Sequence, residues 1–457
     1  MPSLFLLSLP PTLLPAQSRR SRIVRYSCSP TEYPKASRSF RGWNDGVHLT
    51  VSVPSGEATQ VSPPLEEVIS KAKAGYPLSD SDALSFLAAG QDATQEICAA
   101  AADMRDQAKG NTVTFSPKVF IPLTHICRDF CGYCTFRKDP QQAGKDIYMT
   151  PEQVLDVANA GAALGCTEAL FTLGERPEQR YPEAKEWLEH RGFKTTLEYL
   201  TYVCELVLQE TDMLPHANPG TMARREIEAL KPFNPSMGLM LESTSKALYA
   251  KGGPHEFAPS KRPRVRLRTL ELAGQLRVPF TTGILIGIGE SRWDRIESLL
   301  AIAGLHAKYG HVQEVIIQNF RAKPDTAMGN APDAETDEFL WTVAVARLIL
   351  GTDANLQVPP NLSAKDYQIY LGAGINDWGG VSPLTPDFVN PEAPWPALTD
   401  LKKKTEAAGF KLRPRLPVYP EYFLNTNRFL PDALSQKVSA MADAEGYVQG
   451  GMERYDG

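Results

Sequence analysis

The sequence lacks the features of several protein classes. Its 457 residues contain no run of about 18 uninterrupted apolar residues, so no segment is expected to span a membrane. It also lacks a long basic run interleaved with aromatic residues. The 48 Lys and Arg residues are outnumbered by 53 Asp and Glu residues, which gives a formal charge of −5. A nucleic-acid partner is therefore not expected.

Cysteine is scarce as well, and its distribution argues against a disulfide framework. The seven cysteines are an odd number and show no paired spacing over this long chain. Four of them are expected to be ordinary small apolar residues: Cys28, Cys98, Cys166 and Cys204. The other three form a single CxxxCxxC run at Cys127, Cys131 and Cys134, and no second CxxC or HxxxH motif follows.

Three thiolates from one loop predict a metal centre that the protein does not fully ligate. Thiolates are soft ligands that favour iron–sulfur clusters, zinc or copper. A 4Fe-4S cluster normally takes four cysteines, so a cluster held by Cys127, Cys131 and Cys134 alone has one iron free for an outside ligand. An iron in that state can chelate S-adenosylmethionine (SAM). The alternative is a zinc site completed by His125 or by a distant cysteine.

The first 40 residues differ in composition from the rest of the chain. Residues 1–40 hold one acidic residue, Glu32, against six basic ones, and they are rich in serine and proline. This balance predicts a cleaved leader for a chloroplast or mitochondrion. A secretory signal is one alternative, because Leu4 to Ala16 is apolar, but an oxidising lumen would attack an iron–sulfur cluster. A disordered tail on a cytoplasmic protein is another. We expect a reducing compartment.

The rest of the chain divides into three parts. Residues 60–112 are predicted to form a helical extension, residues 113–425 an α/β domain, and residues 426–457 a glycine-containing tail or linker. In the α/β domain, eight apolar β-rich runs alternate with amphipathic ones. The runs are Val119–Leu123, Glu168–Thr172, Met213–Pro215, Met237–Leu241, Thr281–Ile286, Glu314–Gln318, Asn355–Val358 and Trp378–Val381.

Eight strands that alternate with helices predict a parallel sheet, and eight repeats suit a closed or nearly closed TIM-like (β/α) barrel. An open doubly wound sheet is the alternative. Helix signals support the alternation, since Thr150 begins a capping box and Gly310 ends a helical pattern. In either fold, reactive groups lie after the strand ends. The cysteine run begins four residues past the first strand, and later strands are followed by Gly174-Glu175, His216, Glu242, Glu290, Asn319 and Asn361.

Five longer runs carry a resemblance to a known family. They are EALFTLGERPE (168–178), LPHANPGTM (214–222), VPFTTGILIGIGE (278–290), QEVIIQNFRAKPDTAM (313–328) and DWGGVSPLTPDFVNPEAPWP (377–396). Together with CxxxCxxC, they resemble the radical SAM superfamily and, within it, the FO synthase family over roughly residues 60–425. The likeness is to the CofG-type module, which closes the deazaflavin ring of 7,8-didemethyl-8-hydroxy-5-deazariboflavin (FO). It implies a radical SAM barrel with a 4Fe-4S cluster and SAM.

The resemblance also implies a set of cofactor contacts. The cluster ligands would be Cys127, Cys131 and Cys134, and Tyr133 would lie near the adenine. Gly174 and Glu175 stand where the superfamily has a Gly-Gly-Glu run that meets the methionine amino group, although Leu replaces the first glycine. The remaining cofactor contacts would be Glu242, Arg266 or Arg268, Gly283, Leu285, Gly287 and Glu290.

Some of these residues have structural alternatives. Arg266 and Arg268 cannot share one helix face, so one of the two would point to solvent. Glu290 could simply favour the positive end of the following helix.

Six further residues are candidates for substrate binding or catalysis. His216 would be a proton acceptor or substrate contact, or else a core histidine with satisfied hydrogen bonds. Trp378 would stack on an aromatic ring or fill the barrel end. The side chains suited to a uracil edge and a ribityl chain, or to loop capping, are Asn218, Asn319, Arg321 and Asn361.

The reaction implied by the resemblance makes FO from 5-amino-5-(4-hydroxybenzyl)-6-(D-ribitylimino)-5,6-dihydrouracil, with loss of ammonia. The nearest alternative is the sister CofH-type reaction, which joins tyrosine to 5-amino-6-(D-ribitylamino)uracil. A non-catalytic electron carrier or metal-stabilised scaffold is the alternative from another class. The implied partners are an electron donor and a CofH-type protein, or fused module, that supplies the hydroxybenzyl adduct.

Overall fold

The structure is a computed structural model that describes residues 62–455, except residues 91, 145–146, 364, 425 and 427. The leader predicted for residues 1–40 lies outside the described residues. Within them, no helix combines the length and the apolar character needed to cross a membrane.

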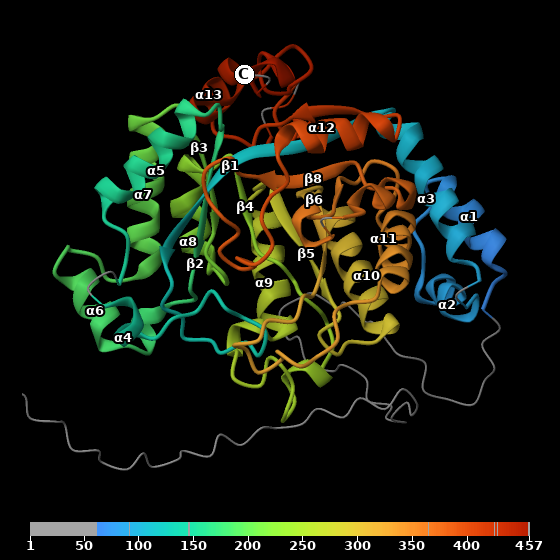
Figure 1. Ribbon diagram of the computed structural model, residues 1–457, viewed down its shortest axis with the longest axis horizontal. Coiled ribbons are helices and arrows are strands. Elements are labelled where there is room, and N and C mark those ends of the chain that lie inside the picture. The colour runs from blue at the N-terminus through green and yellow to red at the C-terminus, as the bar shows by residue number, and fades with distance from the viewer. Residues whose placement is uncertain are drawn as a thin grey trace, which may run out of the picture. The chain divides into compact units, whose positions relative to one another are not determined.

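A closed parallel β-barrel forms the centre of the described chain (Figure 1). Its strands are β1 (Thr112–Thr124), β2 (Glu168–Leu173), β3 (Leu214–Asn218), β4 (Ser236–Gly238), β5 (Phe280–Ile286), β6 (Val312–Asn319), β7 (Leu356–Gln357), β8 (Asp377–Val381) and β9 (Lys411–Pro414). Pairing runs from β2 through β8 to β1, and β1 also pairs with β2. Eight parallel strands therefore close the barrel, which confirms the TIM-like prediction and excludes the open sheet.

Strand β1 has three neighbours. Its first half, Thr112–Pro117, pairs with β9 and β8, and its second half, Lys118–Thr124, pairs with β2. The sequence pattern placed the start of this strand at Val119, because the preceding polar residues and Pro117 interrupt the apolar run. Strand β9 was not predicted and lies outside the eight-strand ring.

Two predicted strands differ from the structure in ways that affect the site. Strand β3 extends to Asn218, so His216 lies within the strand and not in the loop after it. Strand β4 ends at Gly238, three residues earlier than predicted, and Glu242 makes an isolated bridge with Ile284. Glu242 has a φ of 68°, a left-handed conformation that is incompatible with a continuing strand.

Helices cover the outside of the barrel (Figure 1). Those between the strands are α4 (Pro140–Ala143), α5 (Pro151–Ala163), α6 (Pro182–Glu189), α7 (Thr196–Glu210), α8 (Arg224–Leu230), α9 (Pro263–Gln275), α10 (Arg292–Tyr309), α11 (Thr336–Leu350) and α12 (Leu398–Ala407). The capping box predicted at Thr150 forms with Gln153, and Gly310 ends α10 in the left-handed conformation. Both sequence signals are therefore confirmed.

The N-terminal extension consists of α1 (Leu65–Lys73), α2 (Asp80–Ala88) and α3 (Thr94–Lys109), which lie beside α11 (Figure 1). Phe86, Ile97 and Met104 are fully buried in the same apolar cluster as the inner face of α11. Burial of these side chains attaches the extension to the barrel wall.

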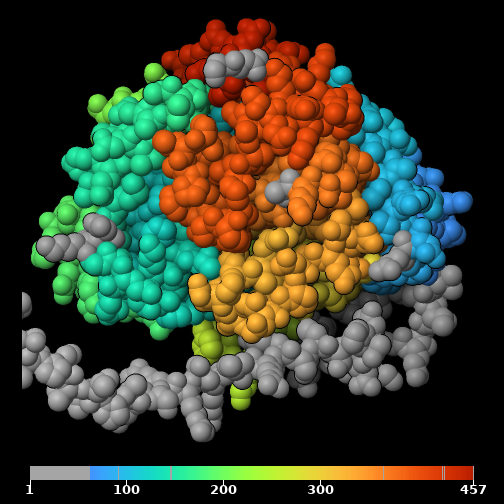
Figure 2. All heavy atoms as spheres, in the orientation of Figure 1, coloured from blue at the N-terminus to red at the C-terminus, as the bar shows by residue number. Residues whose placement is uncertain are grey.

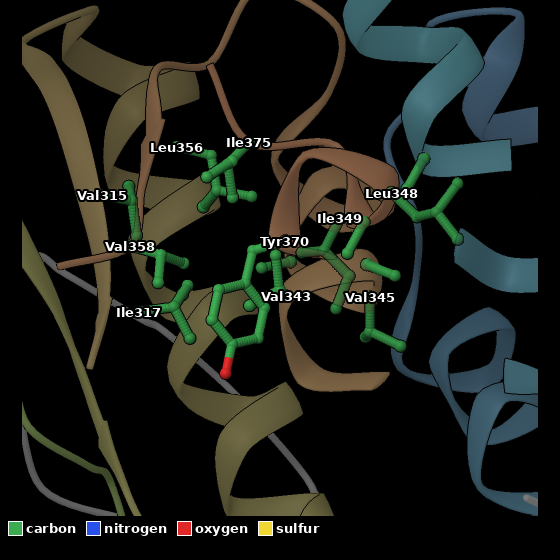
Figure 3. Close-up of a cluster of buried hydrophobic side chains, with 14 of the residues drawn as sticks. Val315, Ile317, Val343, Val345, Leu348, Ile349, Leu356, Val358, Tyr370 and Ile375 are labelled. Atoms are coloured by element: carbon green, nitrogen blue, oxygen red, sulfur yellow. The ribbon is translucent and has the colours of Figure 1, made fainter. Parts of the chain in front are cut away.

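The largest apolar core lies between the sheet and α11. Figure 3 shows Val315 and Ile317 of β6 and Leu356 of β7 close to Ile349 of α11 and to Tyr370 of a short 3₁₀ helix, η6 (Tyr367–Ala373). All of these side chains are at least nine-tenths buried. This packing fixes the barrel wall on one side of the site.

The C-terminal segment differs from the predicted tail or linker at residues 426–457. Helix α13 (Asp432–Met441) presents buried apolar side chains that share a cluster with Leu214 and Leu416. Tyr455 donates a hydrogen bond to the Gly165 carbonyl at 2.9 Å. The glycines suggested a linker, but the apolar spacing on α13 decides the outcome, because it packs the segment against the barrel.

Candidate active site

The barrel encloses a cavity of about 340 Å³, which is within the range of small-molecule sites. It reaches from the cysteine loop, which follows the carboxyl end of β1, to charged side chains nearer the amino ends of the strands. Inward-facing residues recur at every second position along the strands, as the pleat requires. The strand residues that line it include Lys118, Phe120, Glu168, Leu170, Thr172, His216, Asn218, Thr281, Leu285, Glu314, Ile316 and Gln318.

Cys127, Cys131 and Cys134 all line this cavity and are half-buried. Backbone hydrogen bonds hold their loop, with the Gly132 N–H donating to the Pro254 carbonyl at 2.8 Å. Burial raises the pKa of the Cys127 thiol to about 12 and raises that of Cys131 further. Bound metal must therefore displace protons from these thiols.

The donor set fits a 4Fe-4S cluster. In such a cube, each of three cysteines binds a different iron. Within the described residues, no group of three or more His, Cys, Asp or Glu side chains is placed to hold a single metal ion. His125, the alternative fourth ligand, does not line the cavity, and its Nδ1 bonds to the Phe136 carbonyl at 2.9 Å.

Gly174 and Glu175 lie directly against the cysteine loop. A Cβ at Gly174 would come within 2.0 Å of the Ile126 carbonyl oxygen, so only glycine fits there. The Glu175 backbone N–H donates to the Cys127 sulfur at 3.1 Å. The Glu175 carboxylate is buried, which raises its pKa, and it accepts hydrogen bonds from the Thr221 N–H at 3.0 Å and hydroxyl at 2.6 Å. Both residues line the cavity.

Tyr133 and Leu285, two of the predicted cofactor contacts, come together in one buried apolar cluster with Ile288. Cys131 and Cys134 pack against this cluster. The Tyr133 hydroxyl bonds to His255 Nε2 at 2.9 Å.

The two predicted glycines beside Leu285 do not line the cavity. Gly283 lies against β6, where a Cβ would meet the Ile316 carbonyl oxygen at 2.1 Å. Gly287 has a φ of 95° in the turn after β5. The Glu290 carboxylate accepts the N–H groups of Gly287 and Ile288, both at 2.9 Å, and pairs with Arg295 at 2.8 Å. Glu290 therefore holds the turn and does not face the cavity.

Glu242 and Arg266 line the cavity together with Lys261, which the sequence analysis missed. Arg266 lies 3.7 Å from the Glu242 carboxylate. Burial alone would raise the pKa of Glu242, but Lys261 and Arg266 hold it below its usual value. Arg268 lies on the outer side of α9, where its half-exposed side chain pairs with Glu271 at 2.9 Å. Of the two arginines, only Arg266 is placed to meet a ligand.

Only two of the six substrate candidates, His216 and Asn218, line the cavity. Arg321 pairs with Asp333 at 3.2 Å near the surface. Trp378 is fully buried, and its indole N–H donates to Thr405 at 3.0 Å, so it fills the wall under α12.

Two asparagine candidates do not line the cavity themselves but hold loops that do. Asn319 donates to the Leu362 carbonyl at 3.2 Å, and Asn361 donates to Asp387 at 3.1 Å. The loop-capping alternative describes both.

The structure adds a buried ionic network that the sequence analysis missed. Lys118 pairs with Glu168 at 2.8 Å. Arg415 pairs with Glu314 at 2.6 Å and with Asp377 at 2.7 Å. The available signal was a charged residue at an inward position of an otherwise apolar strand, as at Lys118 and Glu314.

Aromatic side chains line another part of the cavity. Phe120 of β1 stacks on Trp395 with ring centroids 5.2 Å apart, and Phe136 lies in the cysteine loop. Trp395 belongs to the segment after β8, which Figure 2 shows in orange-red beside the teal segment after β1. The cavity is therefore aromatic on one side and charged at its inner end.

Comparison with known proteins agrees with this geometry. The model of the radical SAM superfamily matches residues 121–302. The 7,8-didemethyl-8-hydroxy-5-deazariboflavin synthase of Methanopyrus kandleri is 51% identical over 337 residues, which cover 74% of this chain and 100% of that protein. The chain belongs to the FO synthase family. As a radical SAM enzyme of this family, it uses a 4Fe-4S cluster and SAM.

Other FO synthases are longer. Those of Nocardia farcinica and Streptomyces coelicolor are 50% and 49% identical over 83% and 86% of this chain, but the matches cover only 45% and 46% of those proteins. The chain thus spans about half the length of these FO synthase relatives.

Solved structures show the shared fold alone. The hydrogenase maturase HydG superposes with a TM-score of 0.65 at 16% identity, covering 84% of this chain and 81% of its own. Methylornithine synthase gives a TM-score of 0.58 at 19% identity, covering 76% of this chain and 97% of its own.

Proposed function

We propose that this chain catalyses the ring-closing step of FO formation, in which the hydroxybenzyl adduct of ribityliminouracil becomes FO and ammonia is released. The observation that carries the proposal is the full-length match to a separate deazariboflavin synthase at 51% identity. The cavity inside the barrel supports it, because it brings the cysteine loop and a space of small-molecule size together in one site. An adduct source of the CofH type and an electron donor in a reducing compartment belong to the proposal.

In this proposal the chain's own residues bind and orient. Cys127, Cys131 and Cys134 hold the cluster, and Tyr133 with Leu285 packs against the adenine. Glu242 accepts hydrogen bonds from the ribose hydroxyls, and the Arg266 fork matches the methionine carboxylate. When bound, the cluster and SAM supply a 5′-deoxyadenosyl radical that abstracts hydrogen from the substrate.

The test is to supply the preformed adduct, without tyrosine, to anaerobically reconstituted and reduced protein. We expect FO, detected by its deazaflavin fluorescence, to form in the same molar amount as 5′-deoxyadenosine and ammonia. A protein that instead needs tyrosine and ribitylaminouracil, and accumulates the adduct, would carry the CofH-type reaction. Bound zinc without 5′-deoxyadenosine would indicate a scaffold.

A further inference from the structure

The inner end of the cavity carries polar side chains that the cofactor contacts do not use. Lys118, Glu168 and His216 come from β1, β2 and β3, line the cavity and are each more than nine-tenths buried. Lys118 Nζ lies 2.8 Å from the Glu168 carboxylate, and His216 Nδ1 lies 4.0 Å from it. Burial opposes ionisation of Glu168, but Lys118 lowers the pKa of Glu168 to about 2, so its carboxylate is charged at neutral pH.

Hydrogen bonding fixes the tautomer of His216. The Ser236 hydroxyl donates its one proton to the Pro417 carbonyl at 2.5 Å, so it can only accept from His216 Nδ1 at 2.7 Å. Burial lowers the pKa of His216 to about 4, which keeps the ring neutral at pH 7. Nε2 is then a lone-pair acceptor, and among the described residues it has no hydrogen-bond donor.

Two glycines make room for these side chains. A Cβ at Gly238 would lie 3.0 Å from His216 Nε2, and one at Gly380 would lie 2.3 Å from Lys118 Cε. Larger residues at these positions would fill the space into which Lys118 and His216 extend. The inner end of the cavity is therefore built around buried polar side chains that face the cavity, although an apolar barrel filling would avoid the cost of burying them.

We propose that Lys118, Glu168 and His216 form a subsite for a polyhydroxyl chain, namely the ribityl chain of the substrate. The inference rests on the proposed function. The ribityl chain hangs from the nitrogen that bonds to the hydroxybenzyl ring during ring closure. With these reacting atoms near the cysteine loop and the aromatic side chains, the far hydroxyls of the chain extend away from them, toward the inner end of the cavity. A hydroxyl group both donates and accepts, so a row of hydroxyls can donate to Glu168 and to His216 Nε2 and accept from Lys118.

The experiment measures equilibrium binding of two fluorescent ligands to the reconstituted protein: FO, and its analogue with methyl in place of ribityl. We expect wild type to prefer FO, and the preference to fall about tenfold in His216→Phe and in Lys118→Met, as one lost buried hydrogen bond predicts. Affinity for the methyl analogue should not change, which also reports that each variant is folded.

The matched control is His311→Phe. His311 is also a buried histidine with a pKa lowered by burial to about 4, but it bonds to the Leu270 carbonyl and does not line the cavity. This variant should keep the wild-type preference for FO.

Three outcomes would overturn the subsite. If wild type binds FO while both variants keep its preference, or if both ligands weaken equally in both variants, the subsite is wrong and the proposed function stands. If wild type binds neither ligand and forms no FO from the adduct, the subsite and the proposed function fail together.

Discussion

The mouth of the cavity, formed by the cysteine loop, and the inner end of the cavity use polar groups in opposite ways. At the mouth, the thiols of Cys127 and Cys131 have pKa values raised by burial and need an added metal to become thiolates. At the inner end, Arg415 is already paired with Glu314 and Asp377, all from the protein itself. The mouth is completed by a cofactor, whereas the ion pairs of Arg415 are completed by the fold. Changes at the mouth should therefore affect chemistry, and changes to the Arg415 ion pairs should affect stability.

The largest expected effect is at the mouth. Cys131→Ala should lower 5′-deoxyadenosine formation at least about 1,000-fold, because the cluster loses one of three ligands. Its free energy of unfolding without metal should change by less than about 1 kcal/mol, since the side chain is half-buried. Iron analysis, single-turnover assays and urea unfolding measure these effects. Cys98→Ala, in α3, is the control, and nucleoside cleavage that survives in Cys131→Ala would contradict the cluster assignment.

The next largest effect is expected on stability, in the ion pairs of Arg415. Arg415→Met should destabilise the fold by about 3–5 kcal/mol, because it leaves the buried carboxylates of Glu314 and Asp377 without their cation. Arg413→Met, in β9, is the matched control. Arg413 pairs with partly exposed Asp443 at 2.7 Å, so its loss should cost about 1 kcal/mol or less. Equal losses in the two variants, measured by urea unfolding, would refute the distinction.

The two arginines of α9, Arg266 and Arg268, test which side chain contributes to SAM binding. Arg266→Met should weaken SAM binding about tenfold or more, since a buried charged hydrogen-bond donor is lost. Arg268→Met should leave SAM affinity unchanged, because its half-exposed side chain pairs with Glu271 outside the cavity. Equilibrium dialysis with the reconstituted cluster measures both affinities. Weaker binding in Arg268→Met would reverse the assignment.

The smallest effect is a pH dependence of stability. Burial lowers the pKa values of His216 and His311 from 6.5 to about 4. Between these values the unfolded chain binds more protons than the folded one, so the free energy of unfolding should fall as pH drops from about 6.5 to 4. The His311→Gln variant should show a shallower fall. An identical slope in wild type and variant, measured by urea unfolding at several pH values, would contradict this expectation.

The mouth could be predicted from the sequence because its ligands are contiguous. CxxxCxxC places three thiols in one loop, and eight β-rich runs were enough to predict the barrel. The inner end could not be predicted in this way. Lys118, Glu168 and Arg415 are far apart in sequence and meet only when β1, β2 and β9 pair. Strand alternation shows that Lys118 faces inward only after the start of β1 is known, and Pro117 concealed that start.

Local causes decide which of the other candidate side chains face the cavity. Arg266 and Arg268 lie two residues apart on α9, and the choice between them depends on which face of the helix meets the barrel. Glu290 ends the run VPFTTGILIGIGE that carries the family resemblance, but its carboxylate accepts the backbone N–H groups of the turn after β5. Residue type and spacing therefore indicated candidate groups, while the structure decided which way each side chain points.

The anchoring of the C-terminal segment has a consequence for the longer relatives. Tyr455 is held at Gly165, just before β2, and so lies at the amino ends of the strands, whereas the cysteine loop follows the carboxyl end of β1. A segment joined after Tyr455 would therefore begin on the side of the barrel opposite the cysteine loop.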